Sequence, residues 1–205
     1  MNGFHFFSSN RQEVLVQRLA AELTHPLRDP FEKEIVIVQS RGMERWISLQ
    51  LARAHGIAAN IDYPFPVSFA FELFKRMLDD VPEHDPFQQR VMVWKILETL
   101  PRLVHQPPFA PMQRYLEDGE PRKRIQLAER IASLFDRYLI FRPAMVLAWD
   151  RGDVSGDVGE HEHWQALLWR EISRGSAHLH RAALKKRWHE RLRHGPESVR
   201  DLLPE

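Results

Sequence analysis

The apolar positions near the start of the chain predict strands and helices in alternation. Phe4–Phe7 and Glu34–Gln39 are short apolar runs, which are typical of buried strands. The segment between them carries leucines at helical spacing, and Met43–His55 repeats that spacing before Gly56. The order strand, helix, strand, helix is the beginning of a parallel α/β sheet.

Capping signals bound the first of these helices. Asn10 and Glu13 have capping-box spacing, so the Asn side chain can accept from first-turn amides while Glu13 reaches back. The helix is expected to end before Pro26, because proline has no N–H to continue the hydrogen-bond pattern.

Beyond Pro66 the strand signals fade and the pattern becomes helical. The clearest apolar stripe begins after Arg122 and consists of Leu127, Ile131, Leu134, Phe135, Tyr138 and Leu139. Other helices are expected at 67–78, within 86–103, and at 109–116, 143–149, 164–173 and 179–192. The glycine-rich, acidic segment RGDVSGDVGEHE is expected to be a loop.

These elements are unevenly distributed, because a short α/β opening precedes a long helical stretch. Two parallel strands alone cannot form a sheet with both faces buried. We therefore expect an incomplete parallel sheet in residues 1–66 and a mainly helical insertion in residues 67–205. We also expect the native chain to continue beyond Glu205 and to supply the remaining strands.

Composition adds a few constraints. Hydrophobic residues make up 43% of the chain and charged residues 28%, which is ordinary for a soluble globular protein. No apolar run is long enough to span a membrane, and no signal peptide is evident. The absence of cysteine excludes disulfides and thiolate metal sites and fits a cytoplasmic location. The formal net charge is only +1, so nucleic-acid binding would require local clusters of basic residues.

The turn at 39–43 stands where a nucleotide-binding protein would have its phosphate loop. A Walker A loop needs a long glycine-rich bend, a lysine for the phosphate oxygens and a hydroxyl for magnesium. This turn has one glycine, Gly42, and no lysine, and it is too short to encircle a phosphate. Arg41 could touch an anion at the helix N-terminus, where the dipole favours one. We therefore expect a degenerate loop with no nucleotide and no cofactor.

Neither the histidines nor the acidic residues form a convincing metal or nuclease site. The densest cluster is His161, Glu162 and His163, but residues two apart in a helix point to different faces. No third ligand and no HExxH pattern accompany them. No acidic pair lies at a strand end with a following lysine, as a nuclease would require. The sequence thus predicts no catalytic site and no metal.

Several long motifs resemble one family. They are SSNR at 8–11, VQSRGMERW at 38–46, GIAANIDYPFPVSF at 56–69, SLFDRYLIFRP at 133–143 and WQALLW at 164–169. The chain resembles the N-terminal region of the RecC family, the gamma subunits of exodeoxyribonuclease V, which is the RecBCD helicase–nuclease. The similarity extends from about residue 4 to 190, and it covers only the first part of a much longer family member.

The resemblance implies a P-loop, superfamily 1 helicase-like fold that has lost its ATP site and is split by a helical insertion. It further implies a subunit of a heterotrimer with RecB-like and RecD-like partners, which carry or support the helicase and nuclease activities. Such a subunit binds forked double-stranded DNA and guides the unwound single strands. It also scans the 3′-ending strand for the Chi hotspot, in double-strand break repair by homologous recombination.

The resemblance also carries over a set of DNA-binding positions. They are Gln39, Arg41, Arg45, Phe65, Phe71, Ser133, Leu134, Asp136, Arg137, Arg142 and Arg181. Gln39 and Asp136 could pair with base edges, Arg137 and Arg142 with bases or phosphates, and Phe65 and Phe71 with base faces.

Structural explanations of the same positions remain open. Helical spacing places Arg130, Ser133 and Arg137 opposite the apolar stripe, where a solvated helix face is the alternative to DNA binding. Phe71 lies in an apolar helix and is equally suited to the core, and Arg181 belongs to a generally basic helix. Trp94, Trp164 and Trp169 lie at helical spacing with other apolar residues and are expected in the core.

Three of these positions depart from the family's usual pattern. Positions 41 and 45 usually hold smaller neutral polar side chains, and position 133 usually holds an acid. Arg41, Arg45 and Ser133 make the channel more positive, which favours grip on the backbone over reading of bases. A changed hotspot specificity is therefore favoured over a conserved one. The rival hypothesis is a protein-interaction module that docks the partner subunits without touching DNA.

Overall fold

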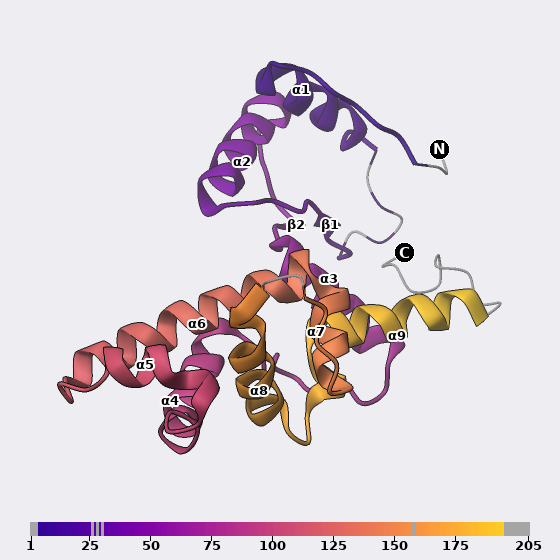
Figure 1. Ribbon diagram of the computed structural model, residues 1–205. Coiled ribbons are helices and arrows are strands. Elements are labelled where there is room, and N and C mark those ends of the chain that lie inside the picture. The colour runs from indigo at the N-terminus through magenta and orange to yellow at the C-terminus, as the bar shows by residue number, and fades with distance from the viewer. Residues whose placement is uncertain (1–3, 26, 28, 30, 157–158, 195–205) are drawn as a thin grey trace. The chain divides into compact units, whose positions relative to one another are not determined.

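The computed structural model describes residues 4–25, 27, 29, 31–156 and 159–194 (Figure 1). The chain divides into two compact units, the first reaching Leu73 and the second beginning at Phe74. None of the helices in the described part has the length and apolar character needed to span a bilayer.

The first unit combines helices with a small parallel sheet. Its elements are α1 (Gln12–Glu22), β1 (Glu34–Ile35), α2 (Arg41–His55), β2 (Ile61–Asp62) and α3 (Pro66–Met77), which crosses into the second unit. Glu34 is in register with Ile61. Backbone bonds continue the pairing beyond the strands, from Val36 N to Asp62 O at 2.9 Å and from Val38 N to Pro64 O at 3.1 Å. The sheet is parallel, as predicted, but its second strand is β2 and not the expected Phe4–Phe7.

Local signals fix α2. Ser40 is its N-cap, and the Ser40 Oγ accepts a hydrogen bond from the Met43 N–H at 3.2 Å. Gly56 closes the helix with a φ of 83°, a left-handed conformation that glycine adopts without a Cβ clash. The predicted end is therefore confirmed, and the helix begins two residues earlier than expected.

Two expectations for the N-terminal segment are wrong. Phe4–Phe7 forms no strand, and Phe4 and Phe6 are 92% and 79% exposed. An apolar run of this length becomes a strand only where a neighbour can pair with it, and in the described residues β1 pairs with β2 instead. The capping box is also absent: α1 has Arg11 as its N-cap without a side-chain cap bond.

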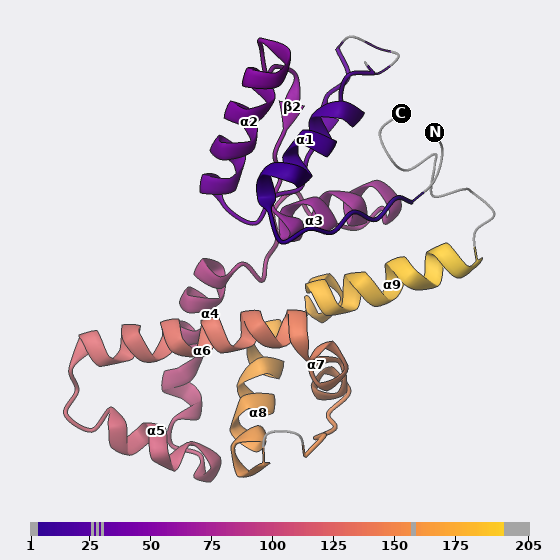
Figure 2. The same ribbon diagram turned by 90° about the horizontal axis from the view of Figure 1, so that it is seen from above.

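The second unit is helical. Its elements are α4 (Gln89–Leu103), the 3₁₀ turn η1 (Pro107–Phe109), α5 (Ala110–Tyr115), α6 (Pro121–Phe141), α7 (Pro143–Asp150), η2 (Gly159–His161), α8 (Glu162–Ser173), η3 (Ala177–Leu179) and α9 (Arg181–His194). α6 is the longest of them, and α5 and α8 lie on the same side of it in both views (Figure 1, Figure 2). α6 packs along α4 and also contacts α7 and α9. The mostly helical character predicted from the apolar stripe is confirmed.

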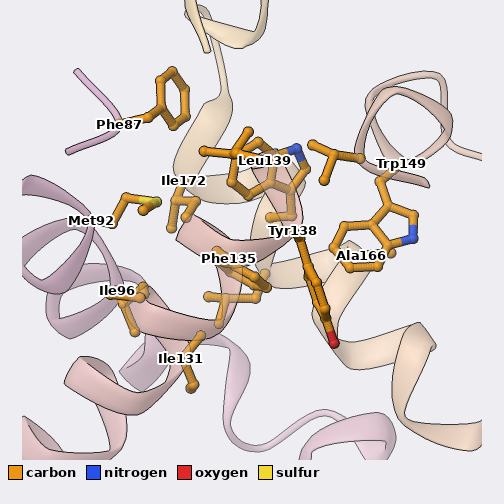
Figure 3. Close-up of a cluster of buried hydrophobic side chains, with 14 of the residues drawn as sticks. Phe87, Met92, Ile96, Ile131, Phe135, Tyr138, Leu139, Trp149, Ala166 and Ile172 are labelled. Atoms are coloured by element: carbon orange, nitrogen blue, oxygen red, sulfur yellow. The ribbon is translucent and has the colours of Figure 1, made fainter. Parts of the chain in front are cut away.

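The core of the second unit is built around the apolar face of α6 (Figure 3). The Phe135 ring lies edge-on to two indoles, with centroid distances of 6.2 Å to Trp149 and 5.4 Å to Trp169. All three side chains are fully buried. Aromatic pairs in this geometry add about 0.5–1.5 kcal/mol each to the burial of their area. Phe135 therefore joins α6 to α7 and α8.

A buried carboxylate anchors the segment between α7 and α8. Glu162 Oε1 accepts hydrogen bonds from Trp149 Nε1 at 2.8 Å and from Ser155 N and Oγ at 2.6 and 2.8 Å. Burial by itself raises the pKa of Glu162, but these donors outweigh it and lower the pKa to about 2. The carboxylate is thus held in its charged form inside the fold.

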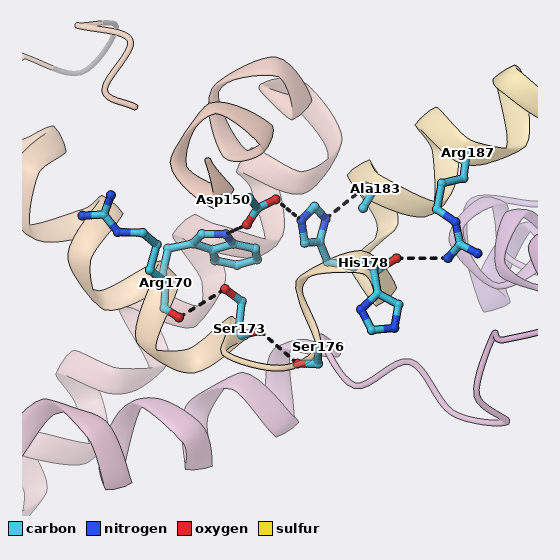
Figure 4. A network of polar contacts seen from close by, with 9 residues as sticks. Asp150, Arg170, Ser173, Ser176, His178, Ala183 and Arg187 are labelled. Carbon is cyan, nitrogen blue, oxygen red and sulfur yellow. Dashed lines mark hydrogen bonds and ion pairs between the residues drawn. The ribbon is translucent and has the colours of Figure 1, made fainter. Parts of the chain in front are cut away.

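A second polar network joins α7, α8 and the start of α9 (Figure 4). The carboxylate of Asp150 accepts from Trp169 Nε1 at 2.8 Å and contacts His180 Nε2 at 2.7 Å. On the other side of the ring, His180 Nδ1 accepts from the Ala183 N–H at 3.1 Å. This pattern places the proton of a neutral ring on Nε2, and it makes His180 the cap of α9.

Candidate nucleic-acid interface

In the first unit, predicted site residues gather at the carboxyl ends of the two parallel segments. The last backbone hydrogen bond between the two segments runs from the Val38 N–H to the Pro64 carbonyl oxygen. Gln39 is the next residue after Val38, and Phe65 is the next residue after Pro64. The Arg41 guanidinium lies over the Phe65 ring, 5.3 Å from its centroid. Ligands of open parallel sheets bind at this edge. Gln39 and Arg41 are exposed there, so both can reach a ligand.

The turn at this edge is shorter than a phosphate loop. Only Gln39 and Ser40 lie between the paired segment and α2, and Gly42 is already helical. The hydroxyl of Ser40 is occupied as the helix cap. The Arg41 Nη1 pairs with Glu44 Oε2 at 2.8 Å, which places a carboxylate in the first turn of α2. A carboxylate at this point opposes a triphosphate, while the arginine can still meet a single phosphate or a base.

The other two predicted residues of this unit differ in accessibility. Arg45 is exposed on α2, one turn beyond Arg41. Phe71 lies on α3 and is 7% exposed, so its ring contributes to packing in this structure. Its proposed role against a base remains a prediction.

In the second unit, one face of α6 borders an open depression of about 440 Å³. The depression is lined by Glu129, Arg130, Ser133, Leu134 and Arg137. This face lies opposite the buried stripe that includes Ile131 and Phe135. The structure thus brings Ser133, Leu134 and Arg137 together on one accessible surface.

The charge of this face comes from arginines without acidic partners. Arg130 and Arg137 are exposed, and no carboxylate lies within ion-pair distance of either among the described residues. Arg142 is also exposed, at the residue where α6 ends and α7 begins. Without an acidic partner among the described residues, the guanidinium groups of Arg130 and Arg137 keep their donors for an incoming anion.

Asp136 and Arg181, by contrast, bind each other. The Arg181 Nη2 pairs with Asp136 Oδ1, and the Arg181 Nε lies 3.4 Å from Asp85 Oδ2. The side chain of Arg181 is only 11% exposed. Burial raises the pKa of Asp85, while the Phe87 N–H and the Arg181 cation oppose that shift. Arg181 therefore compensates two carboxylates and holds α9 against α6.

The structure exposes two aromatic side chains that the sequence analysis did not place on the surface. Trp94 on α4 was expected in the core, but it is 70% exposed because Met92 and Ile96 take the buried side of the helix. Phe141, the last residue of α6, is 76% exposed. The sequence did hold a signal for this exposure, because residues two apart in a helix lie on opposite sides and Leu139 belongs to the buried stripe.

No metal-binding group is evident within the described ranges, where no three His, Asp or Glu side chains converge. Glu162 of the HEH cluster is committed to Trp149 and Ser155. The second unit also has an apolar depression of about 300 Å³ between α4, α5 and α6.

The family model for the RecC N-terminal domain matches residues 4–205. The chain belongs to this family. Among its relatives, the RecBCD enzyme subunit RecC of Escherichia coli (strain K12) is 38% identical over 193 residues. That match covers 91% of this chain and 17% of the relative. The subunit of the same name from Haemophilus influenzae is 31% identical over 200 residues, covering 85% of this chain and 18% of the relative.

A third relative has a similar level of identity. The RecBCD enzyme subunit RecC of Mycolicibacterium smegmatis is 31% identical over 176 residues, covering 82% of this chain and 15% of the relative. The chain therefore spans less than a fifth of the length of these family members. The resemblance inferred from the sequence motifs is confirmed.

Proposed function

We propose that this chain is a non-catalytic, DNA-binding part of a RecBCD-type helicase–nuclease that acts in double-strand break repair by homologous recombination. The names of its relatives support membership of such a complex. In this role the chain assembles with RecB-like and RecD-like subunits, contacts forked DNA and guides the unwound single strands. The α/β unit is then a helicase-like domain without an ATP site, and the sheet is completed by further strands.

The observation that carries the DNA-binding role is the α6 face. Arg130 and Arg137 lie beside an open depression and have no acidic partner among the described residues. Single-stranded DNA is held by cations along its backbone and by flat or polar side chains against its bases. Ser133 and Leu134 lie within the same depression, and Arg142 follows at the helix end. This face is suited to scanning the 3′-ending strand for a Chi-like hotspot.

The edge of the parallel sheet is the second proposed contact. Gln39 can hydrogen-bond a base edge, and the Arg41–Phe65 pair presents a cation on an aromatic ring. Because Arg41 and Arg45 stand where neutral side chains are usual, we expect a stronger hold on phosphates and a changed hotspot preference. Phosphate contacts carry little sequence information.

The direct test is fluorescence anisotropy of a labelled single strand with the 205-residue chain over a salt series. Each phosphate contact on a single strand contributes about 0.7 to the slope of log affinity against log salt. The double variant Arg137→Ala/Arg142→Ala should lower the slope by about 1.4. The matched control is Arg151→Ala/Arg174→Ala, which removes two exposed arginines already paired with Asp153 and Glu171. A slope equal to that of the wild type in the first variant would contradict the proposal.

Protein docking is the second candidate function, favoured by the surface of α4. Trp94 is 70% exposed and its neighbour Val91, one turn away, is 37% exposed. Tryptophan is among the residues enriched at energetic hot spots of protein interfaces. If Trp94→Ala abolished assembly with the partner subunits while Arg137→Ala/Arg142→Ala left DNA binding intact, docking without DNA contact would replace the first proposal.

A further inference from the structure

Phe141 is a large apolar side chain on the surface of the second unit. It is the last residue of α6 and is 76% exposed, although Tyr138 and Leu139 beside it are buried in the core. Exposed apolar side chains are common when they stand alone. Phe141 does not stand alone, because its position in the helix places it among the residues of the α6 face.

Helical geometry puts Phe141 in line with the cationic face. Arg137 precedes it by one turn and Leu134 by two turns, so the three side chains share one stripe with Arg130. Side chains of an α-helix lean toward its N-terminus, which directs the Phe141 ring toward Arg137. The stripe therefore presents a cation, an apolar side chain, a second cation and an aromatic ring in succession.

The backbone around the ring is firmly held. The Arg142 N–H donates to Tyr138 O at 2.9 Å, and Pro143 begins α7 directly afterwards. Tyr138 is itself packed against Phe135 and Trp149. A ring carried on a firmly held backbone has only its own side-chain rotations to lose when it binds a partner, which suits a stacking surface.

The charges select the occupant. The negative charge of Asp136, an acid near this end of α6, is neutralised by its ion pair with Arg181. Asp85 forms an ion pair with the same guanidinium. Arg130 and Arg137 have no acidic partner among the described residues. The depression they border is open, and its lining holds these two arginines against one acid, Glu129, together with Ser133 and Leu134. A polyanion with flat apolar faces fits this combination better than an apolar peptide does.

We propose that Phe141 is a base-stacking residue that extends the α6 face by one nucleotide position, where one base of a single strand packs on its ring. The inference rests on the proposed DNA-binding function and deepens it. Arg137 then holds the adjoining phosphate, so the ring supplies affinity that depends on a base and the arginine supplies affinity that depends on salt.

The experiment compares two labelled single strands, an oligothymidylate and an abasic strand of equal length, binding to the 205-residue chain. Phe141→Ala should bind the oligothymidylate about tenfold more weakly than the wild type, with an unchanged salt slope. Phe141→Tyr keeps the ring and should bind within about twofold of the wild type. The abasic strand should bind the wild type and Phe141→Ala equally. Phe31→Ala, which removes an 88% exposed ring from the first unit, is the matched control.

The outcomes separate this inference from the function on which it rests. If the wild type binds in a salt-dependent way and Arg137→Ala lowers the slope, but Phe141→Ala binds like the wild type, stacking by Phe141 alone is refuted. An equal loss on the abasic strand would also refute it, because no base is then involved. Failure of the wild type to bind either strand at low salt would overturn both proposals. Unchanged DNA binding with lost assembly of the partner subunits would assign Phe141 to a protein contact instead.

Discussion

The carboxylate of Asp136 on α6 is ion-paired with the guanidinium of Arg181, which lies 45 residues later at the start of α9. The same guanidinium lies 3.4 Å from the carboxylate of Asp85. Both residues of the pair were expected to face DNA. Their pairing gives Arg181 a structural role and leaves Asp136 with 29% of its side chain exposed.

Replacement of Arg181 is predicted to destabilise the second unit. Arg181→Met retains most of the side-chain volume but leaves Asp85 and Asp136 without their cation. Loss of one partner from a buried ion pair typically costs about 3–5 kcal/mol. Urea unfolding at pH 7, followed by tryptophan fluorescence, measures the difference. Arg137→Ala on the exposed face of α6 is the control and should change the unfolding free energy by less than about 0.5 kcal/mol.

The pH dependence of the Arg181→Met variant provides an independent check. Burial already raises the pKa of Asp85 above its ordinary 3.8, and removal of the cation should raise it further. The folded variant then binds more protons than the unfolded chain, so its stability falls as pH rises through that interval. The difference in unfolding free energy between Arg181→Met and the wild type should therefore become smaller near pH 4. A gap independent of pH would mean that lost packing, rather than uncompensated charge, causes the destabilisation.

Protonation of Glu162, which anchors the loop between α7 and α8, should be a main cause of the loss of folding stability at low pH. Its pKa is lowered from 4.5 to about 2 by the hydrogen bonds from Trp149 and Ser155, despite its burial. A depressed carboxylate contributes stability that is complete above its ordinary pKa and is lost as pH falls through the folded value. That contribution is about 3 kcal/mol. Acid unfolding between pH 5 and pH 2 should therefore be steep in the wild type.

The Glu162→Gln variant tests this assignment. It should be about 3 kcal/mol less stable than the wild type at pH 7, and the difference should disappear as pH approaches 2. Glu129→Gln, on the exposed face of α6, is the control and should leave the acid transition in place. Parallel pH profiles for Glu162→Gln and the wild type would show that the carboxylate is not the group that titrates.

Much of the second unit could be predicted because helical periodicity is a strong local signal. The stripe from Ile131 to Leu139 identified the buried face of α6 except for Leu134, which is only partly buried and lines the open depression, and Phe135 lies at the centre of the core. Periodicity could not decide whether Phe4–Phe7 forms a strand, because a strand needs a pairing neighbour and the run itself does not specify one. Trp94 shows the corresponding limit for helices: apolar spacing alone did not reveal that Met92 and Ile96 would occupy the core side.

For the candidate site too, features within one helix could be predicted and contacts between distant segments could not. Spacing along one helix placed Arg130, Ser133 and Arg137 on a shared face, as the structure does. The sequence did not predict which distant side chains contact each other, and the ion pair of Asp136 with Arg181 is the main example. A carboxylate and a guanidinium in sequence carry no sign of whether they will meet each other or a ligand.

His180 is another residue whose role arises only in three dimensions, and it offers a further prediction. It is fully buried, caps α9 through Ala183 and contacts Asp150. His180→Ala should lose the cap, the contact with Asp150 and the packing of the ring, at a total cost of about 3 kcal/mol. Asparagine is a good helix cap but is too short to replace the ring. His180→Asn should therefore recover about 1 kcal/mol relative to alanine in thermal or urea unfolding. Equal stability of the two variants would rule out capping as a significant part of its role.

The last prediction concerns the balance between grip and base reading in the first unit. Arg41 and Arg45 are exposed on α2, at the carboxyl edge of the parallel sheet. If both hold phosphates, with Arg41 exchanging its ion pair with Glu44 for a phosphate, Arg41→Gln/Arg45→Gln should lower the salt slope for a single strand by about 1.4. Phosphate contacts bind all sequences alike, so their removal should weaken every strand while the ratio between strands of different sequence is kept or increased. Anisotropy titrations with a panel of equal-length single strands measure both quantities. Arg53→Gln, in the last turn of α2, is the control and removes one charge from the same helix. A lower ratio between sequences in the double variant would mean that these arginines read bases, and the preference of this chain would then depend directly on the two residues.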